Sequence, residues 1–161
     1  MRILGISNNW PGQRGPFGDI FFKRCLLSLA DLGCDIEIIA PRVFLRDQKV
    51  LRNQDRLQVH QPLYFSFSNK PIPVLKNTTC IGEFFKVRSC IRQAKRISKI
   101  FKPEIVYAKF VSTGQSAEAV ARHFEVPWVV SVGESVWDWE NCLIPNYGAE
   151  CLSSLLCKAD G

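Results

Sequence analysis

The chain has 161 residues, of which 47% are hydrophobic and 22% charged, and its formal net charge is +6. This balance is typical of one soluble globular domain with its own core, and no apolar run approaches the roughly 20 residues of a membrane-spanning helix. The N-terminal apolar run is too short for a signal peptide, which predicts a cytoplasmic protein, and the basic surplus permits an anionic partner without selecting one.

The first forty residues predict a strand, a helix and a second strand. Residues 2–7 form an apolar run, and apolar side chains recur at helical spacing over 20–32. Asp19 stands where it can cap that helix. The run "CDIEIIA" (34–40) fits a second strand, which Pro41 stops. Two strands joined by a helix pair in parallel, so this unit starts a parallel sheet.

Strands and helices keep alternating along the rest of the chain. The pattern predicts strands over 57–67, 104–110 and 127–132, and helices over 82–102 and 113–124. This alternation predicts an α/β fold with a Rossmann-like, doubly wound parallel sheet, helices on both faces and three layers. The final run "LSSLLCKADG" looks like a helix that leads to one more strand, so we expect the chain to be part of a longer protein.

A glycine loop follows the first strand, at the edge of the sheet where open α/β proteins bind ligands. Gly12, Gly15 and Gly18 precede a helix, whose N-terminus favours a bound phosphate. Their spacing is G-x-x-G-x-x-G instead of the dinucleotide-binding G-x-G-x-x-G, and no acidic residue ends the second strand. A nicotinamide dehydrogenase is therefore disfavoured. A P-loop is excluded because no G-K-[ST] follows.

Two long stretches carry a resemblance to a known family. "MRILGISNNWP…GPFGDIFFKRCLLSLADLGCDIEIIAP" and "KPEIVYAKFVSTGQSAEAVARHFEVPWVVSVGES" resemble the N-terminal domain of retaining glycosyltransferases of family 4, which have the GT-B fold. The resemblance covers most of residues 1–135. It implies that residues 1–161 are the acceptor-side domain, with a glycine loop that reaches toward the donor diphosphate. The C-terminal domain that holds the nucleotide-sugar in this family would lie outside the chain.

The chain departs from the family pattern at two strand ends. The family often has His-x-His where Tyr107 and Lys109 stand, and His-Gly-Ser where Gly133, Glu134 and Ser135 stand. The histidine that commonly touches the sugar is therefore missing. The donor sugar and the stereochemistry of transfer do not carry over to this chain, and the catalytic residues stay unassigned.

Each candidate site residue has a functional and a structural interpretation. Gly15 and Gly18 either approach a donor phosphate or form a turn before the helix. Lys109 follows an apolar strand, where it either binds an anionic acceptor or is a solvated strand end. Glu134 and Ser135 either bind acceptor hydroxyls or cap the next turn.

The predicted helix over 82–102 is strongly basic. Its apolar stripe, which includes Phe84, is expected to pack on the sheet, and its charges form the opposite face. The charges form either an ordinary solvated face or a patch for an anionic membrane surface. Nucleic acid is disfavoured because no stacking aromatics are interleaved with the charges. The patch residues are Arg92, Lys95, Arg96 and Lys99.

The seven cysteines are scattered through apolar runs and include no C-x-x-C pair. This spacing argues against a disulfide framework and against a zinc site. We expect reduced, mostly buried thiols, and we predict neither a metal ion nor a cofactor.

The sequence and the resemblance together imply the N-terminal half of a glycosyltransferase of the hexosyltransferase type. Such an enzyme moves a sugar from a nucleotide-sugar to a glycan or lipid-linked acceptor, and the expected role is surface polysaccharide synthesis. We expect the protein in the cytoplasm, either free or peripheral at the inner membrane face, and we expect the chain alone to be inactive. The alternative is a non-catalytic Rossmann-like module that binds an anionic ligand. A Glu-x7-Glu motif in a following domain would favour the enzyme.

Overall fold

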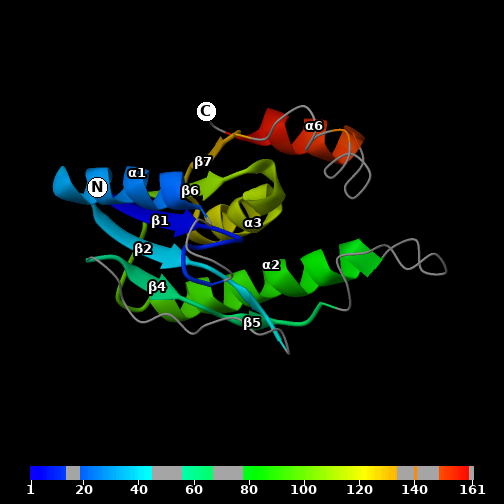
Figure 1. The fold of residues 1–161 in the computed structure, drawn as a ribbon, viewed down its shortest axis with the longest axis horizontal. Helices are drawn as coiled ribbons and strands as arrows, with labels where there is room; N and C mark the ends of the chain where they lie inside the picture. Colours follow the sequence, from blue (N-terminus) through cyan, green and yellow to red (C-terminus); the bar gives the residue numbers. More distant parts are fainter. Residues whose placement is uncertain (14–18, 45–55, 67–77, 134–139, 141–148, 160–161) are drawn as a thin grey trace.

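The computed structural model describes residues 1–13, 19–44, 56–66, 78–133, 140 and 149–159. These residues contain a five-stranded, fully parallel sheet in the order β4-β2-β1-β6-β7 (Figure 1). The strands are β1 (Arg2–Ile6), β2 (Asp35–Ile39), β4 (Gln58–His60), β6 (Ile105–Lys109) and β7 (Trp128–Ser131).

β1 is the central strand because its residues after Arg2 are buried on both faces. Its side chains alternate between two apolar layers, with Ile3 on one face and Leu4 and Ile6 on the other. Ile3 lies in register with Ile36 of β2 and with Ile105 of β6. Near-continuous apolar runs of this kind are typical of parallel strands covered by helices on both faces.

Helices cover both faces of the sheet. α1 (Ile20–Asp31) packs on one face of the sheet (Figure 1). Its Phe22 and Leu26 are buried there with residues of β1 and β2. The helices on the other face are α2 (Thr78–Ile97), α3 (Gly114–Phe124) and α6 (Ala149–Lys158). The predicted Rossmann-like, three-layered α/β fold is therefore confirmed.

The predicted single strand over 57–67 is wrong, because the chain forms two short strands there. β4 ends at His60, and β5 (Leu63–Tyr64) starts after Pro62 and pairs in parallel with β3 (Arg42–Val43). A proline also separates β2 from β3. Proline has no N–H to donate, so both strands break at the same level of the sheet. Hydrogen bonding still continues across the break, since the Arg42 N–H donates to the Pro62 carbonyl oxygen at 2.9 Å.

The basic helix differs from its prediction in its bounds and, in its N-terminal half, in the face that is buried, whereas Ala94 and Ile97 of the predicted apolar stripe are buried as expected. It covers Thr78–Ile97 instead of 82–102, and the chain turns after Ile97, ahead of Pro103. Phe84, which the apolar stripe placed inward, is 59% exposed, whereas Lys86 is only 2% exposed. The burial of Lys86 has a local reason, because its ammonium has polar partners inside the protein.

Candidate functional site

The topology places a ligand-binding edge at the ends of β1 and β6. From β1 the chain passes outward to β2 and β4, and it then returns to the other side of β1 to form β6 and β7. Neighbouring strands whose connections leave in opposite directions form a switch point, and ligands of open α/β sheets bind outside the carboxyl ends of such strands. The polar residues that follow β1 and β6 are therefore the candidate site.

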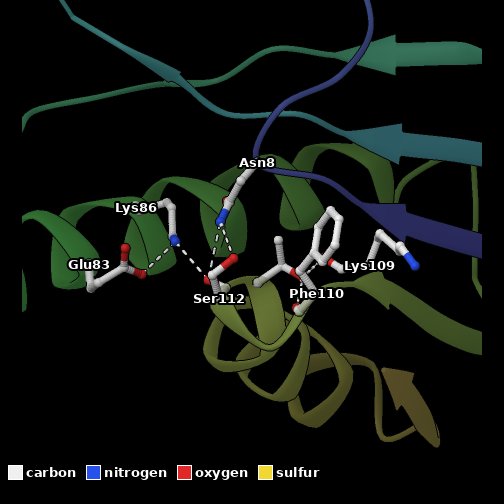
Figure 2. Close-up of polar contacts among 7 residues, drawn as sticks. Asn8, Glu83, Lys86, Lys109, Phe110 and Ser112 are labelled. Atoms are coloured by element: carbon white, nitrogen blue, oxygen red, sulfur yellow. Dashed lines mark hydrogen bonds and ion pairs between the residues drawn. The ribbon is translucent and has the colours of Figure 1, made fainter. Parts of the chain in front are cut away.

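A hydrogen-bonded network crosses this switch point (Figure 2). Asn8 follows β1, and its Nδ2 donates to the carbonyl oxygen of Ser112, after β6, at 3.1 Å. The Lys86 ammonium of α2 donates to the same oxygen at 3.1 Å and forms an ion pair with Glu83 at 2.5 Å. The network joins α2 to both strand ends and leaves the buried Oδ1 of Asn8 without a hydrogen-bond partner among the described residues.

The backbone at the end of β6 is strained. Phe110 has φ +67° and ψ 144°, a combination that a residue with a side chain rarely adopts. Thr113 supports this turn, because the hydroxyl of this fully buried residue lies 2.6 Å from the Lys109 carbonyl oxygen and 2.8 Å from that of Phe110. Strained backbone held by its surroundings is common in binding sites. Here the turn sets the direction in which the side chain of Lys109 leaves the sheet.

Lys109 lies at the ligand edge, where the sequence predicted it. Its ammonium is 4.9 Å from the centroid of the Phe110 ring, and no carboxylate of the described residues forms an ion pair with it. A Cβ on Gly133, after β7, would lie 2.7 Å from the Lys109 Nζ. The glycine thus leaves room for the ammonium. The group can bind an anion at this edge, although no ligand contact tests that role.

Asp19 does not cap α1 through its side chain, which corrects the prediction from sequence. Its carboxylate instead accepts a hydrogen bond from the hydroxyl of Ser7, the residue that follows β1. Burial raises the pKa of the Asp19 carboxyl above its ordinary value of 3.8, while the hydrogen bonds from Ser7 and Asn9 and the charge of Lys109 act in the opposite direction. Asp19 therefore ties the start of α1 to the end of β1.

Several predicted site residues lie outside the described residues, so their roles stay predictions. These are Gly15 and Gly18 of the glycine loop, and Glu134 and Ser135 after β7. The four basic residues of the predicted patch are all exposed, on α2 or just after it. They are Arg92, Lys95, Arg96 and Lys99.

The sequence reasoning missed Asn8, Lys86 and Ser112. A signal for Asn8 was present, because it follows an apolar strand at the ligand edge. Lys86 gave no such signal, because a lysine on a basic helix is normally assigned to the solvated face. Ser112 contributes its main-chain carbonyl oxygen, which no side-chain pattern reveals.

The described cysteines are less buried than expected. Cys25 and Cys157 are exposed, Cys34 is partly buried and Cys90 is fully buried, and all four are free thiols. Burial raises the pKa of the Cys90 thiol to about 11, so it is a structural residue and a poor nucleophile at neutral pH. Within the part of the chain that the structure describes, no cluster of His, Cys, Asp or Glu is arranged to hold a metal ion.

Solved structures share the fold, although no protein-family model and no curated protein matches the sequence. The glycosyltransferase SsfS6 of Streptomyces sp. SF2575 aligns with a TM-score of 0.55 and 15% identity, over 81% of this chain and 38% of its own. Sucrose-phosphate synthase of Thermosynechococcus elongatus aligns with a TM-score of 0.59 and 11% identity, over 97% of this chain and 39% of its own. The calicheamicin glycosyltransferase CalG4 aligns with a TM-score of 0.54 and 15% identity, over 96% of this chain and 40% of its own.

The similarity to these solved structures is a similarity of fold. At 11–15% identity they are consistent with the GT-B type of fold expected from the sequence, and they leave family 4 and retention of stereochemistry as predictions. The chain spans 38–40% of the length of these proteins, so the activity of a whole enzyme is a matter for proposal.

Proposed function

We propose that this chain is the acceptor-side domain of a two-domain glycosyltransferase. The enzyme would move a sugar from a nucleotide-sugar to a glycan or lipid-linked acceptor, in surface polysaccharide synthesis. The observation that carries the proposal is the polar network at the switch point, in a fold shared with three solved proteins, two of which are named as glycosyltransferases and one as a sucrose-phosphate synthase. The acceptor-side assignment rests on the family resemblance.

The described edge offers two groups suited to this chemistry. The ammonium of Lys109 can bind a phosphate of the donor or an anionic group of the acceptor. Asn8 is partly exposed at the same edge and adds a side-chain amide whose Oδ1 has no hydrogen-bond partner among the described residues. Departure of a nucleoside diphosphate builds up negative charge, and fixed donors stabilise such charge without reorganising. Most of that stabilisation is assigned to the nucleotide-binding domain, so we expect the 161-residue chain alone to transfer no sugar.

The test uses the polypeptide that the complete reading frame encodes. Release of nucleoside diphosphate is measured with a panel of UDP-, GDP- and dTDP-sugars and lipid-linked or glycan acceptors. Lys109→Met should lower kcat/KM about tenfold to a hundredfold, the range expected for the loss of a charged hydrogen bond. The matched control is Lys102→Met, since Lys102 is exposed and stands at the opposite end of β6.

Two results would contradict the proposal. One is a folded complete protein that transfers no sugar from any donor, which would favour the non-catalytic binding module. The other is equal activity of the Lys109 and Lys102 variants, which would remove Lys109 from the site.

We also propose that the enzyme works at the inner face of a membrane, in contact with anionic lipid. The first half of α2 exposes Ile81, Phe84 and Phe85 at 40%, 59% and 38%. Exposed basic residues continue from there, beginning with Arg88 and Arg92. Apolar side chains beside a basic stripe suit the headgroup region of a bilayer. No helix among the described residues is long and apolar enough to cross one.

A further inference from the structure

A second polar cavity lies beside the paired strand breaks, away from Lys109. It has a volume of about 590 Å³ and lies between the ends of β4 and β3 and the C-terminal half of α2. Figure 1 shows α2 running alongside β4 and β5. The polar residues of its wall are Arg42, His60, Gln61, Gln93 and Arg96.

The wall of this cavity is held in place by contacts on each side. The Arg42 N–H donates to the Pro62 carbonyl oxygen at 2.9 Å, which fixes the start of β3 against the end of β4. The Ser89 hydroxyl of α2 donates to the Leu63 carbonyl oxygen of β5 at 2.8 Å. The strands contribute Arg42 and the helix contributes Arg96 to the wall of this open cavity.

The His60 imidazole in the cavity wall is held by two side-chain contacts. The Oε2 of Glu37 lies 2.7 Å from Nε2 of His60, and the Gln93 amide nitrogen lies 3.2 Å from Nδ1 of the same ring. These contacts fix the imidazole and direct the carboxylate to it. Among the lining residues that the structure describes, two are arginines and none is acidic.

We propose that this cavity binds a small molecule through an oxyanion group, a phosphate or a carboxylate, held by Arg42 and Arg96. Guanidinium groups suit both anions because their planar fork donates two parallel hydrogen bonds to two oxygens. The Gln61 and Gln93 amides add neutral hydrogen-bonding groups for the rest of the ligand. The proposal does not rest on the transferase function, since the cavity lies on other residues than the Lys109 edge.

The test measures binding to the 161-residue chain by calorimetry, at constant ionic strength. The probes are inorganic phosphate, glucose 1-phosphate and glucuronate, which separate a phosphate from a carboxylate ligand. Saturable binding of at least one probe is expected, and Arg96→Gln should weaken it about tenfold to a hundredfold. Arg42→Gln should act in the same way. The matched control is Arg92→Gln, one turn earlier on α2, which is exposed and outside the cavity wall.

Two outcomes overturn the proposal. The first is the absence of saturable binding of all three probes up to 10 mM, a concentration on the order of the weakest useful affinities. The second is equal weakening by Arg92→Gln and Arg96→Gln, which would mean attraction to surface charge in general. Because Arg96 is exposed, its variant is expected to fold, and thermal unfolding checks this. Sugar transfer is not measured, so a failure here leaves the transferase proposal unaffected.

Discussion

Lys86 carries a charge into the interior, where α2 meets the ends of β1 and β6. Its side chain is 3% exposed, and its ammonium contacts the Glu83 carboxylate and the Ser112 carbonyl oxygen. Burying a charge is costly unless the charge is paired and hydrogen-bonded, so these two partners are what make an ammonium tolerable here. Asn8 donates to the same carbonyl oxygen, so Lys86 also helps to position the ligand edge.

We expect Lys86→Met to lower the free energy of unfolding by about 3 kcal/mol, because it removes the ammonium that pairs with the largely buried Glu83 carboxylate. The double variant Glu83→Gln/Lys86→Met should lose less than the single Lys86 variant. Urea denaturation of the unchanged protein, the two single variants Lys86→Met and Glu83→Gln, and the double variant measures both effects. If the double variant is as unstable as the sum of the single changes, the pair is not coupled and this account of Lys86 is wrong.

Asp19 should make stability depend on pH in a definite direction. Burial makes the pKa of the Asp19 carboxyl higher in the folded protein than in the unfolded chain. The folded protein therefore holds this proton more tightly. The resulting stabilisation is complete below the pKa of the unfolded chain and is lost as the pH rises through the pKa of the folded protein. Asp19→Asn removes this titration, so only the unchanged protein loses the stabilisation as the pH rises. The free energy of unfolding of the variant minus that of the unchanged protein should therefore increase above about pH 4. Urea denaturation of both proteins between pH 3.5 and 7, in steps of about half a pH unit, measures this difference. A difference that falls with pH would refute the inference.

α2 is the element that connects the separate features of the protein. Its 20 residues correspond to about 30 Å of helix, at 1.5 Å per residue. Cys90, Ala94 and Ile97 face the sheet, while Lys86 holds the strand ends and Arg96 lines the second cavity. The opposite face is apolar near Phe84 and basic beyond it. One helix thus contributes to the core, the site edge, the cavity and the proposed membrane contact.

Binding to anionic vesicles should depend on the exposed face of α2. Four changes to glutamine there should abolish cosedimentation with phosphatidylglycerol vesicles, at Arg88, Arg92, Lys95 and Lys99. Arg96 is left in place because it lines the cavity. Binding should also fall steeply with salt, because the Debye length is about 8 Å at physiological ionic strength.

The control for this experiment removes the same charge from other elements, with glutamine at Arg24, Lys102, Arg122 and Lys158. All four residues are exposed, so both sets should fold. Equal loss of binding in the two variants would show attraction by net charge alone and would contradict a membrane contact by α2. Binding that is insensitive to salt would contradict the peripheral contact.

The layout of the whole molecule was largely predictable because short stretches of the sequence identify its central strands and the helices between them. Runs such as "RILGI" and "DIEII" show which segments are buried, and alternation with helices implies a parallel sheet. The break at Pro62 was missed because apolar alternation continues through it. The buried face of the N-terminal half of α2 was missed for a different reason: stripes through Phe84 and through Lys86 both have helical spacing, and both continue to Ala94 and Ile97. The partner that decides between them, Ser112, is 26 residues from Lys86.

The site was predictable only where a residue follows a strand directly. Lys109, at the end of β6, belongs to that class, because strand ends mark the ligand edge of an α/β sheet. The glycine loop was predicted on the same ground, and the roles of Gly15 and Gly18, which lie outside the described residues, stay predictions. The second cavity was not predictable in this way. Arg42 and Arg96 come from separate elements, and the carboxylate that faces His60 is 23 residues away in the sequence. Such a charge arrangement exists only after the strands have paired and α2 has packed.

The central place of β1 has a consequence for how the chain acquires its structure. β1 precedes the other strands of this sheet in the chain, and β2 follows it after a short helix, but its other neighbour, β6, ends only at Lys109. The contact between Arg2 and Glu104 spans 102 positions. One edge of β1 therefore stays open while most of the chain is being synthesised, and closing it means bringing distant segments together, which is slow in folding. The strand of this sheet that is synthesised first is thus one of the last to complete its hydrogen bonds.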